Sequence, residues 1–237
     1  MKRRLLVPVA LLLILAAVSP AVAEDFRVYN GDREQKRIAI TIDDCYRIEQ
    51  VREALAISRR DDVPFTFFVL GVVIKEKDAR LWQAIASSSC EIGNHTYGHY
   101  DLLKLDRKTL YTQIMKTQSA LDAVLGYHYP MQVLRPPFGN LNGKVDQMIC
   151  STGYDHAILW DVDSTDLEEC YKHVKNGSIL LFHARAKDIA CIDALLPRLR
   201  ADGYELVTVS ELIGKQPLVP GGEPYELVNY YDWIEQQ

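Results

Sequence analysis

The chain has 237 residues, of which 48% are hydrophobic, 25% charged and 9% aromatic. This composition excludes a disordered or collagen-like chain, because it supplies enough apolar surface for a packed core, and the length suits one large domain or two small ones. The formal net charge is −5, and the only basic block is Lys2–Arg4, so nucleic acids and anionic membranes are poor candidate partners.

The first residues have the layout of a secretory signal peptide. Met1–Arg4 is basic, Leu5–Val18 is almost wholly apolar, and Ser19–Ala23 supplies small residues before Glu24. The apolar run is shorter than the roughly 20 residues that span a bilayer, which favours cleavage over an uncleaved membrane anchor. We therefore predict a signal peptide over 1–23 and a mature protein that is secreted, periplasmic or in the cell envelope, with no other membrane contact.

Short apolar runs rich in β-forming residues recur along the rest of the chain and alternate with stretches of helical periodicity. The predicted strands are Arg37–Asp43, Phe65–Leu70, Glu91–Asn94, Gln132–Arg135, His156–Trp160, Ser178–Phe182 and Glu205–Val209. The predicted helical faces are Ile48, Val51 and Leu55; Leu110, Ile114, Leu121 and Leu125, with a stop at Gly126; Val145, Met148 and Ile149; and Leu195, Leu196 and Leu199. This alternation predicts an α/β fold with a parallel sheet, and seven strands suggest a barrel or barrel-like sheet.

The domain organisation follows from the same pattern. We predict a short lead-in over 24–36, a single domain over 37–214 and a C-terminal tail over 215–237. The tail begins in Gln216–Pro224, which is rich in proline and glycine.

Five cysteines lie beyond the predicted signal peptide, namely Cys45, Cys90, Cys150, Cys170 and Cys191. None forms a C-x-x-C pair, so a structural zinc knuckle is not indicated. An exported protein can oxidise its cysteines, but an odd number leaves at least one free or paired between chains, and the sequence leaves the pairing open.

Polar residues collect where predicted strands end. The strand-end segments are Ile42–Asp44, Asn94–His99, Leu134–Gly139, Trp160–Asp166 and Leu181–His183. Catalytic groups of parallel α/β barrels lie at the carboxyl ends of the strands, so these five segments would supply carboxylates, imidazoles and a guanidinium to one rim.

Asp43 and Asp44 are adjacent carboxylates that point in different directions from a strand end. One can bind a cation while the other stays free as a base. The alternative is a solvated acidic turn, which the directly preceding apolar run disfavours.

His95 and His99 are four residues apart, a spacing that on a helical turn places both rings on one side. With Asp44 they would form a set of two imidazoles and one carboxylate that leaves positions open for water and substrate. Without the upstream Asp pair, a chance pair of histidines on a surface helix would be the better interpretation.

Arg135 and His183 complete the candidate set. Arg135 precedes two prolines that stiffen the backbone, which suits a guanidinium that binds a carboxylate bidentately. The alternative is a surface ion pair. His183 closes an apolar strand, where a histidine is often only a core residue. It could act as a proton donor if Asp163 or Asp166 orients it.

These motifs together resemble the polysaccharide deacetylase family, carbohydrate esterase family four, which shares the nodulation-factor deacetylase homology domain. The similarity covers about Ile38–Leu212. The matching segments and family motifs are Thr41–Asp44 for Thr-Phe-Asp-Asp, His95–His99 for His-Thr/Ser-x-x-His, Arg135–Gly139 for Arg-Pro-Pro-Tyr/Phe-Gly, Asp163–Asp166 for Asp-x-x-Asp-Trp, and Leu181–His183 for Leu-x-His. Cys45 replaces the usual Gly of the first motif, and Leu167 replaces the Trp of the fourth.

The resemblance implies a distorted (β/α)7 barrel and a metal-dependent hydrolase. It would remove N-acetyl groups from N-acetylglucosamine-type residues of a glycan such as peptidoglycan, a chitooligosaccharide or an exopolysaccharide. The implied metal is divalent, zinc first, with Co²⁺, Mn²⁺ or Ni²⁺ as alternatives. The glycan is the expected partner, and a monomer is expected.

The resemblance also assigns roles to individual residues. They are metal binding by Asp44, His95 and His99; base catalysis by Asp43; orientation of Asp43 by Arg135; proton donation by His183; support of His183 by Asp166; an oxyanion contact from the backbone N–H of Phe138; and substrate contacts at Leu181 and Leu167.

Three other functions stay open at this point. The same scaffold could carry an O-acetyl esterase or another amidohydrolase, because fold does not fix substrate. A non-catalytic glycan-binding protein with a relic site is the second, and a surface protein with an incidental histidine pair is the third. Cys45 as a nucleophile is disfavoured, because no separate Cys–His–Asn pattern is present.

Overall fold

The computed structural model describes residues 25–216. The predicted signal peptide over 1–23 and all but the first two residues of the predicted tail lie outside this range. The strands are β1 (Arg27–Val28), β2 (Arg37–Asp44), β3 (Thr66–Val69), β4 (Glu91–Asn94), β5 (Ala157–Ile158), β6 (Ile179–His183) and β7 (Glu205–Leu206). The α-helices are α1 (Ile48–Asp61), α2 (Ala79–Ala86), α3 (Arg107–Leu125), α4 (Gly143–Cys150), α5 (Leu167–His173), α6 (Ala186–Ala201) and α7 (Val209–Leu212). Within 25–216, no helix combines the length and apolarity that crossing a bilayer requires.

The main sheet is parallel and has β2 at its centre. β3 and β6 pair with β2, β4 pairs with β3, and β7 pairs with the first two residues of β2. Helices connect the parallel strands, as such connections require. The predicted α/β class with a parallel sheet is therefore confirmed.

A single irregular stretch connects the two edges of this sheet. The end of β4 bridges to Leu134, which in turn bridges to Ala157 in β5. Further along the same stretch, Val162 bridges to Leu180 in β6. We call residues 157–162 the seam. Its first two residues pair with β1 in a short parallel ladder, and only isolated bridges join the seam to Leu134 and to β6, so the barrel is distorted at this point.

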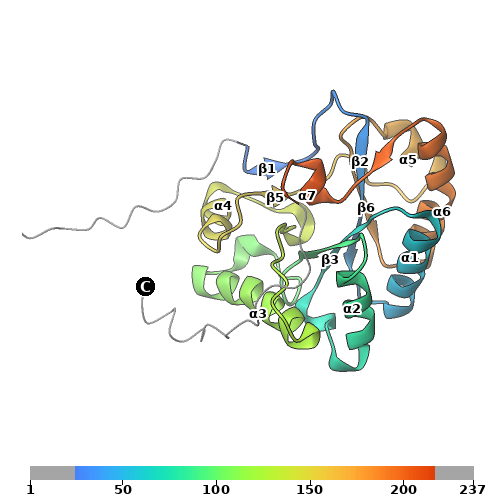
Figure 1. Cartoon of the computed structure of the whole chain (residues 1–237). Helices are drawn as coiled ribbons and strands as arrows, with labels where there is room; N and C mark the ends of the chain where they lie inside the picture. The colour runs from blue at the N-terminus through green and yellow to red at the C-terminus, as the bar shows by residue number, and fades with distance from the viewer. Residues whose placement is uncertain (1–24, 217–237) are drawn as a thin grey trace, which may run out of the picture.

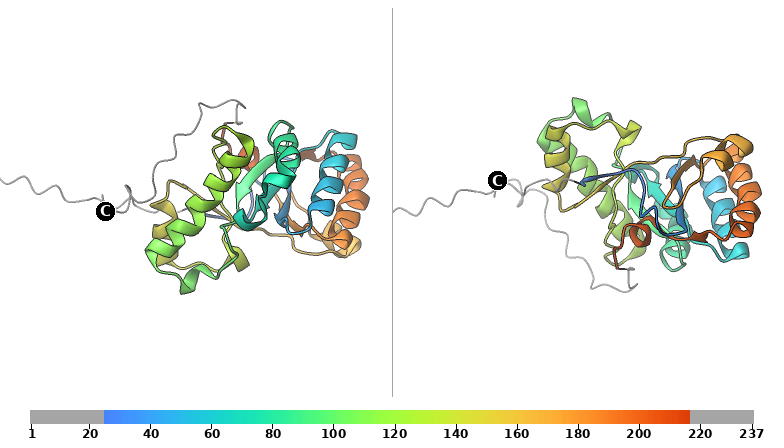
Figure 2. Two further views of the ribbon diagram at one scale, coloured as in Figure 1. Left: turned by 90° about the horizontal axis from the view of Figure 1, so that it is seen from below. Right: turned by 90° about the horizontal axis from the view of Figure 1, so that it is seen from above.

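The helices cover the outside of the sheet (Figure 1). In both views of Figure 2, α1 and α6 lie side by side on one flank, and α3 with α4 occupies the other. α2 packs on α3, and α5 packs on α6. Helices therefore cover the sides of the barrel, and the short α7 packs against β2.

Alternation along β2 sorts its side chains between two environments. Ile38, Ile40 and Ile42 join the large core cluster that includes residues of α1, α2 and α6. Ala39 belongs instead to a cluster with Phe68, inside the barrel. Because side chains alternate along a strand, Thr41 and Asp43 point to the same inner side as Ala39.

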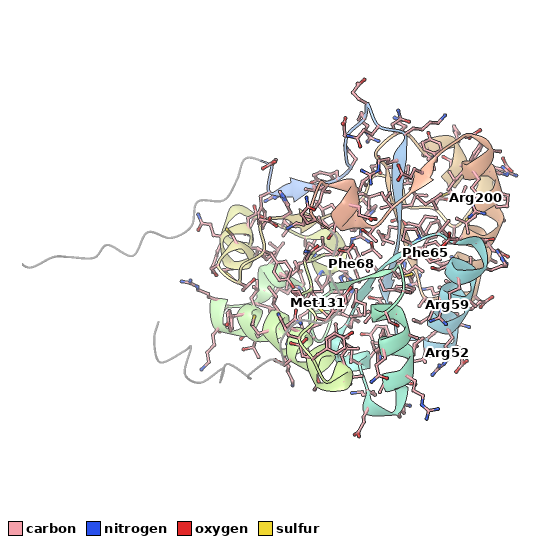
Figure 3. The ribbon with its side chains drawn as sticks, viewed as in Figure 1. Arg52, Arg59, Phe65, Phe68, Met131 and Arg200 are labelled. Carbon is pink, nitrogen blue, oxygen red and sulfur yellow. The ribbon has the colours of Figure 1, made fainter. Side chains whose placement is uncertain are left out.

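The side-chain view agrees with this division. Phe65 and Phe68 lie in the interior and are completely buried, whereas Arg52, Arg59 and Arg200 lie at the periphery on α1 and α6 (Figure 3). The long stems of such arginines can cover apolar helix surface while their charges stay in water.

Several predicted strand bounds differ from the structure. The strand predicted over Gln132–Arg135 is reduced to one residue, Leu134, which bridges to Asn94 and Ala157, and Pro136 and Pro137 have no N–H to extend a ladder beyond it. The strand predicted over His156–Trp160 is shortened to β5, and the one predicted over Glu205–Val209 to β7. Thr208 ends that last segment, since its side chain caps α7 in a capping box with Glu211.

Candidate metal centre and active site

The candidate site residues converge at the carboxyl ends of the strands. Asp43 and Asp44 are the last two residues of β2, and His183 is the last residue of β6 and the register partner of Asp43. His95 directly follows β4, and Arg135 directly follows the Leu134 bridge. The topology therefore brings together residues that are up to 140 positions apart in the chain.

Asp44, His95 and His99 form a compact cluster. Asp44 Oδ1 lies 3.5 Å from His95 Nε2 and 3.4 Å from His99 Nε2. One ligand atom from each of the three residues lies within 4.8 Å of the other two. Bonds of about 2.0–2.2 Å in a tetrahedral zinc site place neighbouring ligand atoms about 3.4 Å apart, so the observed separations fit such an ion.

Two further observations fit a cation at this cluster. Asp44 Oδ1 is buried and has no hydrogen-bond partner in the described structure. An unpaired buried carboxylate oxygen is costly, so a cation there would satisfy it. Asp44 and His99 keep 16% and 23% of their side-chain surface exposed, which leaves a side open to solvent.

The ring of His95 is oriented by its other nitrogen. Nδ1 lies 2.8 Å from the carbonyl oxygen of Arg135, an acceptor, so Nδ1–H donates and the Nε2 lone pair faces Asp44. Burial lowers the pKa of His95, with the nearby carboxylates opposing the shift. A neutral imidazole is the form that binds a metal.

The backbone around the site is in an unusual conformation. Six residues other than glycine within 25–216 have positive φ, and the five that lie in the site are Asp44, Cys45, Thr96, His99 and Phe138. Such angles cost free energy for L-residues and concentrate at functional sites. His95 and His99 lie in a loop, not on the helical turn that their spacing predicted, and the positive φ of 68° at Thr96 and 58° at His99 brings the rings together.

Asp43 is held by Arg135 inside the barrel. Arg135 Nη1 donates to Asp43 Oδ1 at 2.7 Å and to Thr41 Oγ1 at 2.6 Å, and the guanidinium is completely buried. It lies 4.2 Å from the ring centroid of Phe68, a cation–π contact. Asp43 Oδ2 points towards the metal cluster, 3.7 Å from His95 Nε2.

The predicted bidentate contact of Arg135 is not observed. Only Nη1 contacts Asp43, because Nη2 donates instead to the carbonyl oxygen of Leu159 at 3.0 Å. Arg135 therefore connects Asp43 on β2 to the seam.

His183 has a different carboxylate neighbour from the predicted one. Asp188, 1% exposed, accepts a hydrogen bond from the His183 backbone N–H at 2.8 Å and lies 3.8 Å from His183 Nδ1 through the same oxygen. Asp166 is exposed, and its side chain caps the N-terminus of α5 by accepting from Glu169 N–H. Asp188 carries no motif signal, since it is one of two carboxylates on α6 and belongs to none of the strand-end segments.

Of the remaining predicted residues, Phe138 lies at the rim of the site. Its φ is 62° and its ψ is −2°, and its ring contacts His99 edge-on with a centroid distance of 4.5 Å. Leu181 is buried in β6, and Leu167 is half-buried against the large core cluster.

Cys45 is unsuited to act as a nucleophile. It is completely buried, and burial together with the charges of Asp43 and Asp44 raises the pKa of its thiol well above its usual value. The neutral thiol is a poor nucleophile.

Comparison with known proteins identifies relatives. The profile of the polysaccharide deacetylase family matches residues 30–157. The peptidoglycan-N-acetylglucosamine deacetylase PgdA of Listeria monocytogenes is 31% identical over 194 residues, 78% of this chain and 40% of PgdA. The peptidoglycan-N-acetylmuramic acid deacetylase PdaC of Bacillus subtilis is 31% identical over 191 residues, 76% of this chain and 39% of PdaC. The chain thus spans about two fifths of the length of these relatives.

Solved structures share the fold. The structure of Bacillus subtilis PdaC matches with a TM-score of 0.66 and 27% identity, covering 76% of this chain and 91% of the solved one. A carbohydrate esterase family four pseudoenzyme from Bacillus anthracis matches with a TM-score of 0.74, 23% identity and coverage of 83% and 72%. The predicted distorted (β/α)7 barrel is confirmed by these matches. Because the fold occurs in a pseudoenzyme too, activity must be argued from the side chains of the site.

Proposed function

Because the chain belongs to the polysaccharide deacetylase family, we propose that it is a metal-dependent hydrolase that removes N-acetyl groups from N-acetylglucosamine-type residues of a glycan. The observation that carries this proposal is the position of Asp44 Oδ1, buried without a hydrogen bond and 3.4–3.5 Å from two imidazole nitrogens. A second carboxylate, Asp43, lies beside this cluster with one oxygen free of Arg135.

Asp44, His95 and His99 would hold the divalent metal. Two imidazoles and one carboxylate are a donor set that zinc uses in hydrolases, with Co²⁺, Mn²⁺ and Ni²⁺ as alternatives. When bound, the metal supplies Lewis-acid polarisation of the acetamide carbonyl and lowers the pKa of a water molecule.

The protein's own groups supply the proton transfers. Asp43 Oδ2 takes the proton of the attacking water, and Arg135 keeps the carboxylate in place through Oδ1. His183 donates a proton to the amine nitrogen as its bond to the acetyl carbon breaks, giving acetate and a free amino sugar. The backbone N–H of Phe138 donates to the developing oxyanion. Asp188, which accepts from the His183 backbone N–H and lies 3.8 Å from the imidazole Nδ1, takes in this proposal the supporting role that the sequence assigned to Asp166.

The substrate class and location are part of the proposal. Two relatives are named as peptidoglycan deacetylases that act on different sugars, which makes an N-acetylated envelope glycan the first substrate to test. A glycan in the cell envelope agrees with the export that the sequence predicts.

Acetate release tests the proposal. We expect the zinc-loaded protein to release acetate from N-acetylated chitooligosaccharides or peptidoglycan fragments, and a chelator to stop the release. O-acetylated xylan is the comparison substrate, and faster release from it would point to an esterase. No release from any substrate with any of the four metals, together with retention of the glycan, would establish the non-catalytic alternative.

A further inference from the structure

Three exposed aromatic residues lie next to residues of the candidate metal centre. Within 25–216, the large apolar side chains that remain exposed are Tyr29 (51%), Tyr46 (55%), Tyr100 (55%), Leu103 (45%) and Phe138 (59%). Tyr46 lies two residues after Asp44, Tyr100 directly follows His99, and Phe138 lies in the turn after Arg135. We call Tyr46, Tyr100 and Phe138 the aromatic rim.

We infer that the aromatic rim binds the substrate glycan by stacking against the pyranose rings next to the sugar that is deacetylated. This inference rests on the proposed function and adds the residues that select an oligosaccharide over a single sugar. Exposed apolar surface is unfavourable in water, so a cluster of it beside polar site residues indicates a binding surface.

Phe138 carries two costs that folding does not explain. Its φ of 62° is in the left-handed region, where a residue other than glycine loses about 1 kcal/mol. Its ring is also 59% exposed, so it contributes little to the core. The strained backbone holds the ring edge-on against His99 at 4.5 Å, which fixes an apolar face beside the metal cluster.

The ring of Tyr100 lies close to Gly98, on the loop that carries His95 and His99. A Cβ added at Gly98 would lie 2.7 Å from Cε2 of the Tyr100 ring, so the ring rests where any larger residue would displace it. Gly98 N–H is itself fixed by a hydrogen bond to Gln113 Oε1 at 2.8 Å. The ring therefore lies against the backbone of the histidine loop with more than half of its surface open.

Tyr46 lies on the side of the cluster formed by Asp44. Its hydroxyl can donate to a sugar hydroxyl while the ring covers the apolar C–H face of a pyranose. This combination of an apolar body and a polar tip suits a neutral carbohydrate.

Steady-state kinetics of the zinc-loaded full chain test the inference. Tyr46→Leu and Tyr100→Leu keep an apolar side chain but remove the flat ring. For an N-acetylchitooligosaccharide, we expect each to raise KM about threefold to tenfold, with a smaller change in kcat, because stacking binds ground state and transition state alike. For a monomeric N-acetylglucosamine glycoside, the rise in KM should be clearly smaller. Tyr46→Phe and Tyr100→Phe should restore most of the oligosaccharide KM.

Tyr29→Leu is the matched control. Tyr29 is equally exposed but lies next to Asn30, which pairs with Ser178 at the opposite end of β6 from His183. It should leave the KM for the oligosaccharide at the wild-type value. Wild-type KM values in both rim leucine variants, or the same rise in Tyr29→Leu, would overturn the inference.

A binding measurement separates this inference from the proposed function. Calorimetry of the oligosaccharide on metal-free wild type and on the metal-free leucine variants needs no turnover and no bound metal. If wild type releases no acetate but binds the oligosaccharide more tightly than the variants, the proposed function fails and the aromatic rim stands. If wild type releases acetate while all variants bind equally, only the rim is rejected.

Discussion

At the scale of single residues, the site depends on carboxylates in different environments. Asp44 offers an unpaired oxygen to two imidazoles, whereas Asp43 is fixed by a buried guanidinium through one oxygen and keeps the other free. Asp43 and Asp44 have the same side chain, but their different surroundings suit Asp44 to bind a metal and Asp43 to act as a base.

Asp43→Asn should separate metal binding from turnover. The amide is the same size and can still accept from Arg135, but it cannot take a proton, so acetate release should fall about 10²–10⁴-fold. Metal content per chain should stay at the wild-type level, measured by elemental analysis after dialysis. Wild-type turnover by this variant would exclude Asp43 as the base.

Cys45 offers a test of the strained turn. Its φ of 61° suits glycine, the residue that stands here in the resembling family motif. Cys45→Gly should therefore change the unfolding free energy by less than about 1 kcal/mol, since relief of strain offsets the lost packing. Cys45→Val puts a β-branched side chain at positive φ and should destabilise by more than about 2 kcal/mol. Urea unfolding compares the two, and equal stabilities would contradict the argument.

At the scale of secondary-structure elements, the bounds of strands and helices are predicted best where an apolar pattern extends over many residues. β2 and β4 lie within one residue of their predicted bounds, and α3 ends at Gly126, whose φ of 79° makes it the helix stop. α2, α5 and the two-residue β1 were not predicted, although α4, as short as α2, was predicted from its apolar face and the glycine that follows it. Order along the chain identified the strand-end residues, but only the three-dimensional structure could show that Asp188 replaces Asp166 beside His183.

All five cysteines are free in the structure, and the contact between α5 and α6 brings one candidate pair together. Cys170 on α5 and Cys191 on α6 are buried and have their thiols in hydrogen-bond contact. Oxidised glutathione should convert this pair to a disulfide, with loss of two protons and two electrons and formation of two reduced glutathione molecules. Mass spectrometry of the oxidised, alkylated protein should find the Cys170–Cys191 peptide pair.

Two variants control the cysteine experiment. Cys170→Ser should abolish the cross-link, whereas Cys150→Ser, on α4, should leave it intact. A linked pair of any other composition in the wild-type protein would contradict the prediction.

Glu91 joins β4 to α7 at the end of the barrel opposite the site. Its buried carboxyl group accepts from Thr66 and Ser210, and burial raises the pKa of Glu91 although these hydrogen bonds oppose the shift. The folded state therefore holds this proton to a higher pH than the unfolded chain, whose pKa is about 4.3. The contribution of Glu91 to unfolding free energy should fall as pH rises from that value to the raised folded pKa.

Glu91→Gln tests this pH dependence, because its side chain does not titrate. Urea unfolding between about pH 4 and 8 should give a flatter stability curve for the variant than for wild type. Parallel curves would show that Glu91 does not titrate differently in the two states.

At the scale of the whole molecule, the barrel separates chemistry from stability. The candidate metal ligands, base and proton donor occupy the carboxyl ends of the strands, whereas Glu91 and α7 fasten the amino ends. This division is the usual one in parallel barrels. The formal net charge of −5 for the chain is compatible with a neutral glycan partner and gives no support to a polyanion.

Metal removal should lower the stability of the whole chain. A ligand that binds only the folded state stabilises it by about 2.7 kcal/mol at 100 times its dissociation constant. Excess zinc should therefore raise the melting temperature of wild type, and a chelator should reverse the rise. His99→Ala should lose most of this zinc response, while the control Tyr29→Leu keeps it. A zinc response of wild-type size in His99→Ala would argue against the cluster as the binding site.

The pairing of the seam affects how firmly Arg135 holds the Asp43 carboxylate in place. Residues 157–162 are flanked by isolated bridges, and Arg135 is hydrogen-bonded both to this stretch, at Leu159, and to Asp43. The seam is joined by two isolated bridges and a two-residue ladder with β1, whereas β2 pairs over four residues with β3 and five with β6, so the amide hydrogens of the seam should exchange with deuterium sooner than those of β2. Each local opening of the seam would remove the hydrogen bond from Arg135 to Leu159, so the position of the Asp43 carboxylate depends on the pairing of a segment on the far side of the guanidinium.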